Sequence, residues 1–236
     1  MHRSPIVLAA TVAAGATLTL AAAASAQHSD IDFAYDNGKI AVEFGDEGQV
    51  FEGEFPTSGL FEQFTDDPGF AVADGNLGSG DLIDYNILSP LFYHDGTGFQ
   101  PVTPGVSIQI DNNPNGSATV DENTDTVFGS DIPGSVGQAD EEGGLHAHID
   151  FTLTDASSGD APPVGAYGFL TQVTTDASGI ADSDPFAVVF NFGLDEEPFE
   201  TGVESFATNV VPEPTSLAIA GILGTGLLMR RRRLNR

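Results

Sequence analysis

Residues 30–45 read Asp-Ile-Asp-Phe-Ala-Tyr-Asp-Asn-Gly-Lys-Ile-Ala-Val-Glu-Phe-Gly, and this stretch indicates the fold class of the 236-residue chain most directly. Large apolar residues recur at every second position on both sides of Asn37-Gly38. A period of two is typical of a β-strand, and Asn-Gly supplies the two positive φ angles of a tight hairpin turn. The stretch therefore predicts a β-hairpin.

The rest of the chain continues this pattern, with turn-forming Gly, Pro, Asp and Asn recurring about every eight to twelve residues. It predicts an all-β fold, an antiparallel β-sandwich of jelly-roll or Greek-key type, with no helix in the domain. The run Ala-Val-Val-Phe at 187–190 predicts a central strand packed on both faces. Residues 196–211 are expected to form a last strand and a tether, and residues 129–144 and 157–163 to form loops. Further strands are expected at 82–88, 105–110, 117–120, 145–153, 166–174 and 186–192.

Both ends of the chain carry targeting signals. The first 26 residues combine Arg3, an apolar stretch at 6–24 and the small-residue site Ala24-Ser25-Ala26, which predicts a signal peptide and a mature chain that begins at Gln27. Residues 209–236 form the second signal. There, Pro212, Glu213 and Pro214 precede a short apolar run at 217–229, and a basic stop follows at Arg230, Arg231, Arg232 and Arg233.

This tail resembles the PEP-CTERM sorting signal of Gram-negative bacteria. The resemblance implies export, a transient anchor in the inner membrane, processing by an exosortase-type enzyme, and a final place at the cell surface or outside the cell, with envelope polysaccharide as a partner. Signal peptidase is expected to remove the N-terminal signal at Ala24-Ser25-Ala26. Thirteen apolar residues span only about 20 Å of a hydrocarbon core of about 30 Å, so the predicted transmembrane helix is marginal. An ordinary single-pass anchor without processing is the alternative.

Residues 27–208 are expected to form one acidic domain. Between Gln27 and Val211 stand 34 carboxylates and a single basic residue, Lys39, a formal charge of −33. Such a surface excludes nucleic-acid binding, because no cations are present to displace phosphate counterions. The chain has no cysteine, which excludes disulfides and thiolate sites.

The segment Leu-His-Ala-His-Ile-Asp-Phe at 145–151 is the first candidate site. On a strand, His146, His148 and Asp150 share one face, and two imidazoles with a carboxylate suit zinc or another divalent transition metal. His28 or His94 could complete the set. The alternative is that the two histidines only face water at an edge of the sandwich.

A second candidate, for calcium, is the stretch from Asp111 to Glu122. Asp111, Asn113, Asn115 and Glu122 match the oxygen-ligand positions of an EF-hand loop, but the flanking residues predict strands rather than helices. The alternative is an Asx-rich hairpin turn.

No nucleophile–base motif of a known enzyme class is present in the sequence. We therefore expect an exported surface or matrix protein with a structural or binding role and not an enzyme. A divalent-metal-binding module is the first alternative, and a polysaccharide-acting hydrolase is the second.

Overall fold

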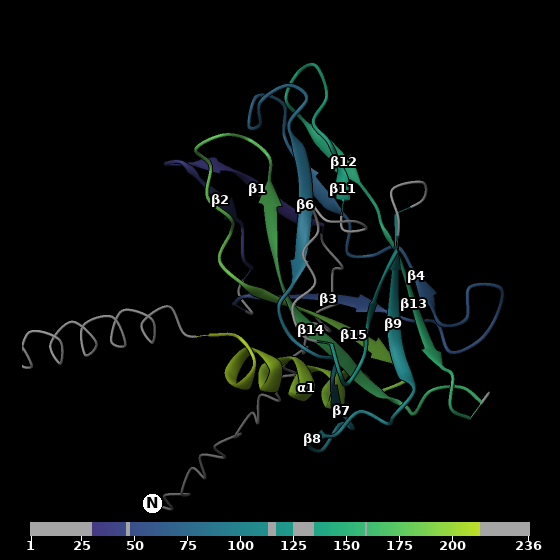
Figure 1. Ribbon diagram of the computed structural model, residues 1–236. Coiled ribbons are helices and arrows are strands. Elements are labelled where there is room, and N and C mark those ends of the chain that lie inside the picture. Colours follow the sequence, from purple (N-terminus) through teal and green to yellow (C-terminus); the bar gives the residue numbers. More distant parts are fainter. Residues whose placement is uncertain (1–29, 46–47, 113–116, 125–134, 159, 213–236) are drawn as a thin grey trace, which may run out of the picture.

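The computed structural model describes residues 30–45, 48–112, 117–124, 135–158 and 160–212 (Figure 1). The described chain is mostly β, as the sequence predicted, and its strands form three sheets. The predicted signal peptide and residues 213–236 lie outside the described residues. Within the described part of the chain, no helix has the length and apolar character to cross a membrane.

The first sheet has the strand order β12-β5-β1-β2 and contains the predicted hairpin. β1 pairs with β2 in antiparallel register, and Asn37 and Gly38 adopt φ angles of 51° and 79°. The hairpin prediction is therefore confirmed, together with its turn. The strands of this sheet are β1 (Ile31–Asp36), β2 (Lys39–Val42), β5 (Phe70–Val72) and β12 (Leu145–Ala147).

The second sheet has the order β10-β9-β13-β4, with every neighbouring pair antiparallel. β9 and β10 are the strands predicted around residues 105–110 and 117–120. The strands of this sheet are β4 (Phe64–Thr65), β9 (Val106–Asp111), β10 (Ser117–Val120) and β13 (Asp150–Asp155).

The third and largest sheet runs β11-β6-β14-β15-β3, and β7 and β8 extend it beside β14. The strands predicted at 82–88, 166–174 and 186–192 are its central members. The strands of this sheet are β3 (Val50–Glu54), β6 (Leu82–Ile87), β7 (Phe92–His94), β8 (Phe99–Gln100), β11 (Ser135–Gln138), β14 (Gly165–Thr175) and β15 (Phe186–Phe192).

Three details of the predicted strands and loops are wrong. The sheets are not purely antiparallel, because β1 pairs with β5, and β15 with β3, in parallel. β11 lies in the predicted loop at 129–144, whose first six residues are outside the described part. Finally, the strand expected at 145–153 is two strands, β12 and β13, which belong to different sheets.

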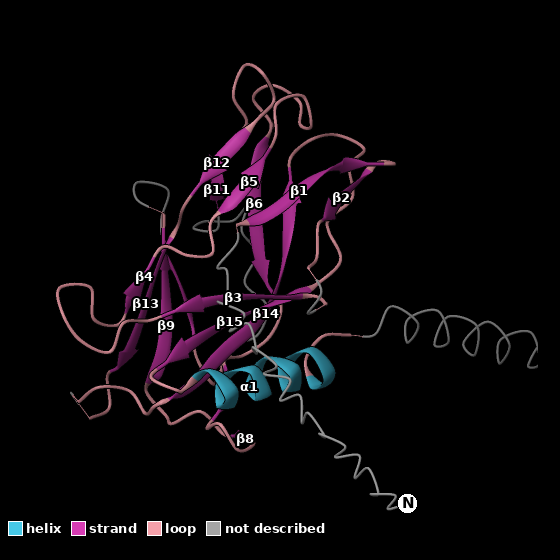
Figure 2. Ribbon diagram, turned by 180° about the vertical axis from the view of Figure 1, so that it is seen from behind, coloured by secondary structure: helices cyan, strands magenta, loops and turns pink. Residues whose placement is uncertain are grey.

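Residues 196–211 form a helix, α1 (Glu196–Asn209), and not the expected strand and tether. Phe199, Gly202, Val203 and Phe206 are its buried residues. They recur at the three- and four-residue spacing of one helix face, and this face lies against the sheet, as Figure 2 shows for β3, β14 and β15. Glu196 and Glu197 lie in the first turn, where their negative charges interact favourably with the helix dipole and stabilise the helix.

β15 joins the two parts of the core. Its alternate residues, from Phe186 to Phe192, face the main cluster between the sheets, while Ala187 and Val189 face the smaller cluster beneath α1. The prediction of a central strand packed on both faces is therefore confirmed. The helix covers the second face of this strand, where Ala187 and Val189 are apolar and would otherwise be exposed to solvent.

Candidate metal centre

The candidate site lies where the chain crosses twice between the first and second sheets. One crossing connects β4 to β5 through residues 66–69, and the other connects β12 to β13 through His148 and Ile149. The strands before and after these links pair with each other, β4 with β13 and β5 with β12. The two links therefore meet at one corner of the fold.

Asp30, directly before β1, lies at the same corner. Ile31 of β1 pairs with Phe70 of β5 in parallel, and Ala147 of β12 pairs with Phe70 from the other side. At the position before Phe70, the same register places Gly69 between Asp30 on one side and His148 on the other. The Ile31 amide donates a hydrogen bond of 2.8 Å to the Gly69 carbonyl oxygen, which holds this alignment.

Gly69 lets the two flanking side chains meet. A Cβ at this position would lie 2.7 Å from the Asp30 Oδ1 atom and 2.7 Å from the His148 Cε1 atom. Real Cβ atoms essentially never approach other atoms so closely, so any other residue here would push the two side chains apart. The arrangement of Asp30 and His148 therefore requires a glycine at position 69.

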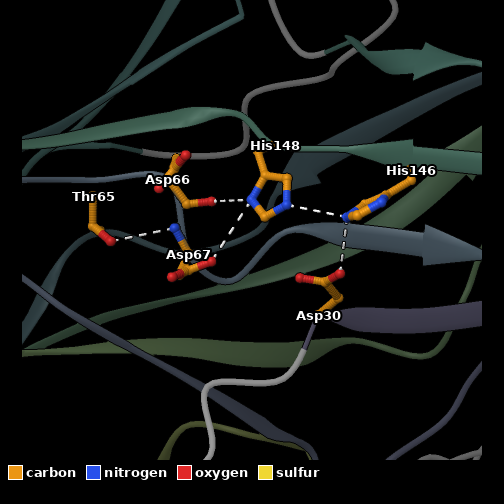
Figure 3. A network of polar contacts seen from close by, with 6 residues as sticks. All are labelled: Asp30, Thr65, Asp66, Asp67, His146 and His148. Carbon is orange, nitrogen blue, oxygen red and sulfur yellow. Dashed lines mark hydrogen bonds and ion pairs between the residues drawn. The ribbon is translucent and has the colours of Figure 1, made fainter.

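Three ligand atoms, from Asp30, His146 and His148, converge at this corner (Figure 3). The Nε2 atoms of His146 and His148 are 3.1 Å apart, and the His146 Nε2 atom is 3.2 Å from the Asp30 Oδ2 atom. A tetrahedral ion with bonds of about 2.0–2.1 Å has ligand atoms about 3.3–3.4 Å apart. Both distances lie close to that value, so the three atoms could bind one divalent transition ion after a small outward shift.

The second nitrogen of His148 faces the β4–β5 link. Its Nδ1 atom lies 2.9 Å from the carbonyl oxygen of Asp66 and 3.6 Å from the Oδ1 atom of Asp67. A proton on Nδ1 is donated to the carbonyl, which leaves the lone pair on Nε2, where it faces His146. This contact therefore orients the ring as a ligand on its Nε2 side.

The site is open to solvent on one side. The side chains of His146, His148 and Asp30 are 67%, 36% and 28% exposed. Three protein ligands with an accessible fourth position can hold a water molecule or an exogenous ligand on the ion. The arrangement is therefore able to bind a metal without enclosing it.

The other residues of the sequence prediction lie elsewhere or outside the described chain. Asp150 was expected as the third ligand, but among the described residues the carboxylate beside the two imidazoles is Asp30. Asp150 begins β13, opposite Asp111 of β9, in the second sheet. Burial, and then the charges of Asp66 and Asp111, raise the pKa of its carboxyl above the usual range.

Of the two additional histidines, His94 lies away from the site. His28 lies outside the described residues. His94 is buried in β7, where its ring packs against Phe99, and its Nδ1 atom accepts a 3.1 Å hydrogen bond from the Gly96 amide. Burial lowers the pKa of His94, so this ring is a neutral part of the core beneath α1.

The predicted calcium ligands do not form a group in the described chain. β9 and β10 are antiparallel, with Ser117 opposite Asp111 and Val120 opposite Ile108. Glu122 follows Val120 and lies more than about 10 Å along the strand from Asp111, because each strand residue advances about 3.3 Å. The connection is a hairpin, which is the alternative interpretation, and Asn113 and Asn115 lie outside the described residues.

Of the predicted sorting motif, only Pro212 belongs to the described chain. Pro212 is exposed, two residues beyond Val210, the C-cap of α1. Glu213, Pro214 and the stop at Arg230, Arg231, Arg232 and Arg233 lie outside the described residues. The helix therefore leads directly into the predicted tail.

Sequence reasoning missed Asp30, Asp66, Asp67 and Gly69 as members of the site. They are far from residues 146–148 in the chain, and only the pairing of β5 with both β1 and β12 brings them together. The available signal was Asp-Asp-Pro-Gly at 66–69, an acidic turn between two short apolar stretches. Without the strand pairing, this turn could not be distinguished from the other acidic turns of the chain.

Comparison with known proteins identifies no family for this chain. No protein-family model matches it, and a search of curated proteins found no match. The functional argument therefore rests on the residues of the chain and their geometry.

Proposed function

We propose that this chain is an exported, acidic surface or matrix protein whose β domain binds a divalent transition-metal ion at Asp30, His146 and His148. The observation that carries the metal proposal is the convergence of two imidazole nitrogens and a carboxylate oxygen from separate segments within 3.1 and 3.2 Å. Zinc and copper are the ions best suited to such a ligand set. The role is structural or binding and not catalytic, and a polysaccharide-acting hydrolase is the less supported alternative.

Export and sorting are supported by the two terminal signals in the sequence. In this proposal signal peptidase removes residues 1–26, the apolar segment 217–229 holds the chain in the inner membrane, and an exosortase-type enzyme processes it near Pro212-Glu213-Pro214. Envelope polysaccharide is the proposed surface partner. The finer fold type, a jelly-roll or Greek-key sandwich, is also part of this proposal.

Calorimetric titration of zinc into the full chain, kept in mild detergent because of its apolar tail, tests metal binding. The parent should bind zinc, and the His146→Ala, His148→Ala double variant should lose at least about tenfold in affinity, as removal of metal-supporting groups usually does. Asp30→Asn should weaken binding as well. Asp160→Asn removes an equal charge from an exposed loop and should change little. Equal binding by the double variant and the parent would refute the proposed site.

Sorting is tested separately by the intact mass of the protein released at the surface of its own host. The mature protein should begin at Gln27 and lack the arginine-rich end of the tail. If Arg230–Arg233 remain attached to the surface protein, the proposed processing is wrong, whatever the outcome of the zinc titration.

A further inference from the structure

The imidazole of His148 stands between two groups of ligand atoms. Its Nε2 atom faces His146 and Asp30, and its Nδ1 atom faces the link that carries Asp66 and Asp67 (Figure 3). Each side forms a group of three residues whose ligand atoms lie within 4.8 Å of one another, and His148 belongs to both. One ring thus has a potential cation position at each nitrogen.

The charges at this corner favour a second cation. Asp30, Asp66 and Asp67 bring three carboxylates to one imidazole pair. Lys39, the single basic residue between 27 and 211, lies 2.6 Å from Asp184 in another part of the fold. One divalent ion would therefore leave the group of carboxylates with excess negative charge.

We propose that the corner binds two divalent ions that share His148, one at Nε2 with His146 and Asp30 and one at Nδ1 with Asp66 and Asp67. This inference rests on the proposed metal-binding function and adds a second position to it. The second position is richer in oxygen ligands, so it accepts harder divalent ions as readily as zinc or copper.

Binding of both ions to the His148 ring balances in protons and in charge. When the second ion binds, the proton that His148 Nδ1 donates to the Asp66 carbonyl passes to solvent, and the ring becomes an imidazolate. Two divalent ions then carry four positive charges, against three carboxylates and one imidazolate. The first ion assists this step, because a cation on one ring nitrogen makes the proton on the other more acidic.

Copper(II) provides a probe that reports both the number of ions and the shared ring. The full chain in mild detergent is loaded with copper(II), freed of loosely bound metal by gel filtration, and examined by metal analysis and electron paramagnetic resonance. The parent should retain two ions per chain, with a spin intensity well below that of two independent ions, because an imidazolate couples the two spins. His148→Ala should lose both the coupling and at least one ion.

The Asp66→Asn, Asp67→Asn double variant separates the two positions. It removes both carboxylates on the Nδ1 side and no ligand atom on the Nε2 side, so it should retain one ion with full spin intensity. The Asp160→Asn, Asp182→Asn double variant removes the same charge from exposed positions and should behave as the parent.

The outcomes distinguish this inference from the proposed function. A parent that retains one copper ion with full intensity overturns the shared ring and leaves the first site in place. Two ions without coupling also overturn it, because they would not share His148. A parent that retains no ion contradicts both proposals.

Discussion

Gly69 determines whether the Asp30 and His148 side chains can meet, since it lies directly before β5 and is aligned between these two residues. Gly69→Ala leaves every charge and every ligand atom in the chain, but its Cβ would overlap both side chains. We therefore expect the variant to lose at least about tenfold in zinc affinity, the range found when groups that orient ligands are removed. Calorimetric titration measures this loss.

Gly98→Ala is the matched control for Gly69→Ala. A Cβ at Gly98 would have no atom within 4 Å, so this variant should bind zinc as the parent does. Unchanged zinc affinity in Gly69→Ala would show that the three ligand atoms do not need the close approach seen here.

Asp150 provides a residue-scale test based on pH. Its pKa is raised by burial first, and then by Asp66 and Asp111, so the folded chain binds this proton more tightly than the unfolded chain does. The charged carboxylate therefore destabilises the fold at neutral pH, and this penalty disappears as the pH falls through the raised pKa. Asp150→Asn should raise the melting temperature at pH 7, measured with a metal chelator present.

The difference between Asp150→Asn and its parent should shrink as the solution is acidified toward the pKa of Asp150. Asp160→Asn, which removes a charge from an exposed loop, should give a smaller change at pH 7. A lower melting temperature for Asp150→Asn at pH 7 would contradict this account. The same variant should still bind zinc, because Asp150 is not beside the imidazoles.

At the scale of elements, α1 shows where sequence patterns succeeded and failed. The hairpin at 30–45 was predictable because its alternation and its Asn-Gly turn are both local. The helix carries the apolar spacing of Phe199, Val203 and Phe206, but Gly202 and the two threonines of the helix lower its helix propensity. Its stability comes from the apolar face of the sheet beneath it, which no local pattern reveals.

The residues of the candidate site also differ in how far the sequence could predict them. His146 and His148 were predictable because their spacing is local and the exposed-buried alternation continues through residue 151. Asp150 was expected with them because one uninterrupted strand was assumed. The buried Ile149 sits at the bend where the chain leaves the first sheet, and a change of sheet cannot be read from alternation alone.

Phe206 tests the packing of α1. Its side chain is fully buried, and its ring lies 5.1 Å from Phe99 and 6.5 Å from Phe92 between centroids. Phe206→Ala should lower the free energy of unfolding by about 3–5 kcal/mol, the usual cost of such a truncation. Denaturant titration measures this, and Thr208→Ala on the exposed face should stay within about 0.5 kcal/mol of the parent. A loss below about 1 kcal/mol for Phe206→Ala would mean that the helix is not held as described.

The proposed metal site lies between elements of two sheets, so an ion bound there should stabilise the fold beyond the residues that it contacts. An ion that binds only the folded chain adds about 2.7 kcal/mol at a hundred times its dissociation constant. Zinc should then raise the melting temperature and slow amide exchange at residues 66–71 and 146–150. Both effects should be absent in the His146→Ala, His148→Ala variant. Exchange at these residues that does not respond to zinc would contradict a connecting role.

At the scale of the whole molecule, the dominant property is charge. The region from Gln27 to Val211 carries 34 carboxylates against Lys39, which itself lies 2.6 Å from Asp184. Ion pairs between basic and acidic side chains therefore contribute little to this fold, and the apolar clusters between the sheets and beneath α1 must outweigh the mutual repulsion of the carboxylates.

This repulsion predicts that the fold becomes more stable as ionic strength rises. At physiological salt, charges are screened over about 8 Å, and at molar salt over about 3 Å, so added sodium chloride removes repulsion between neighbouring carboxylates. The melting temperature should rise steadily from dilute buffer to molar sodium chloride in a chelator-treated sample. Potassium chloride should act equally, because screening depends on ionic strength and not on the identity of the cation. A melting temperature that stays flat or falls over this range would mean that the carboxylates are already too well separated and solvated to oppose folding.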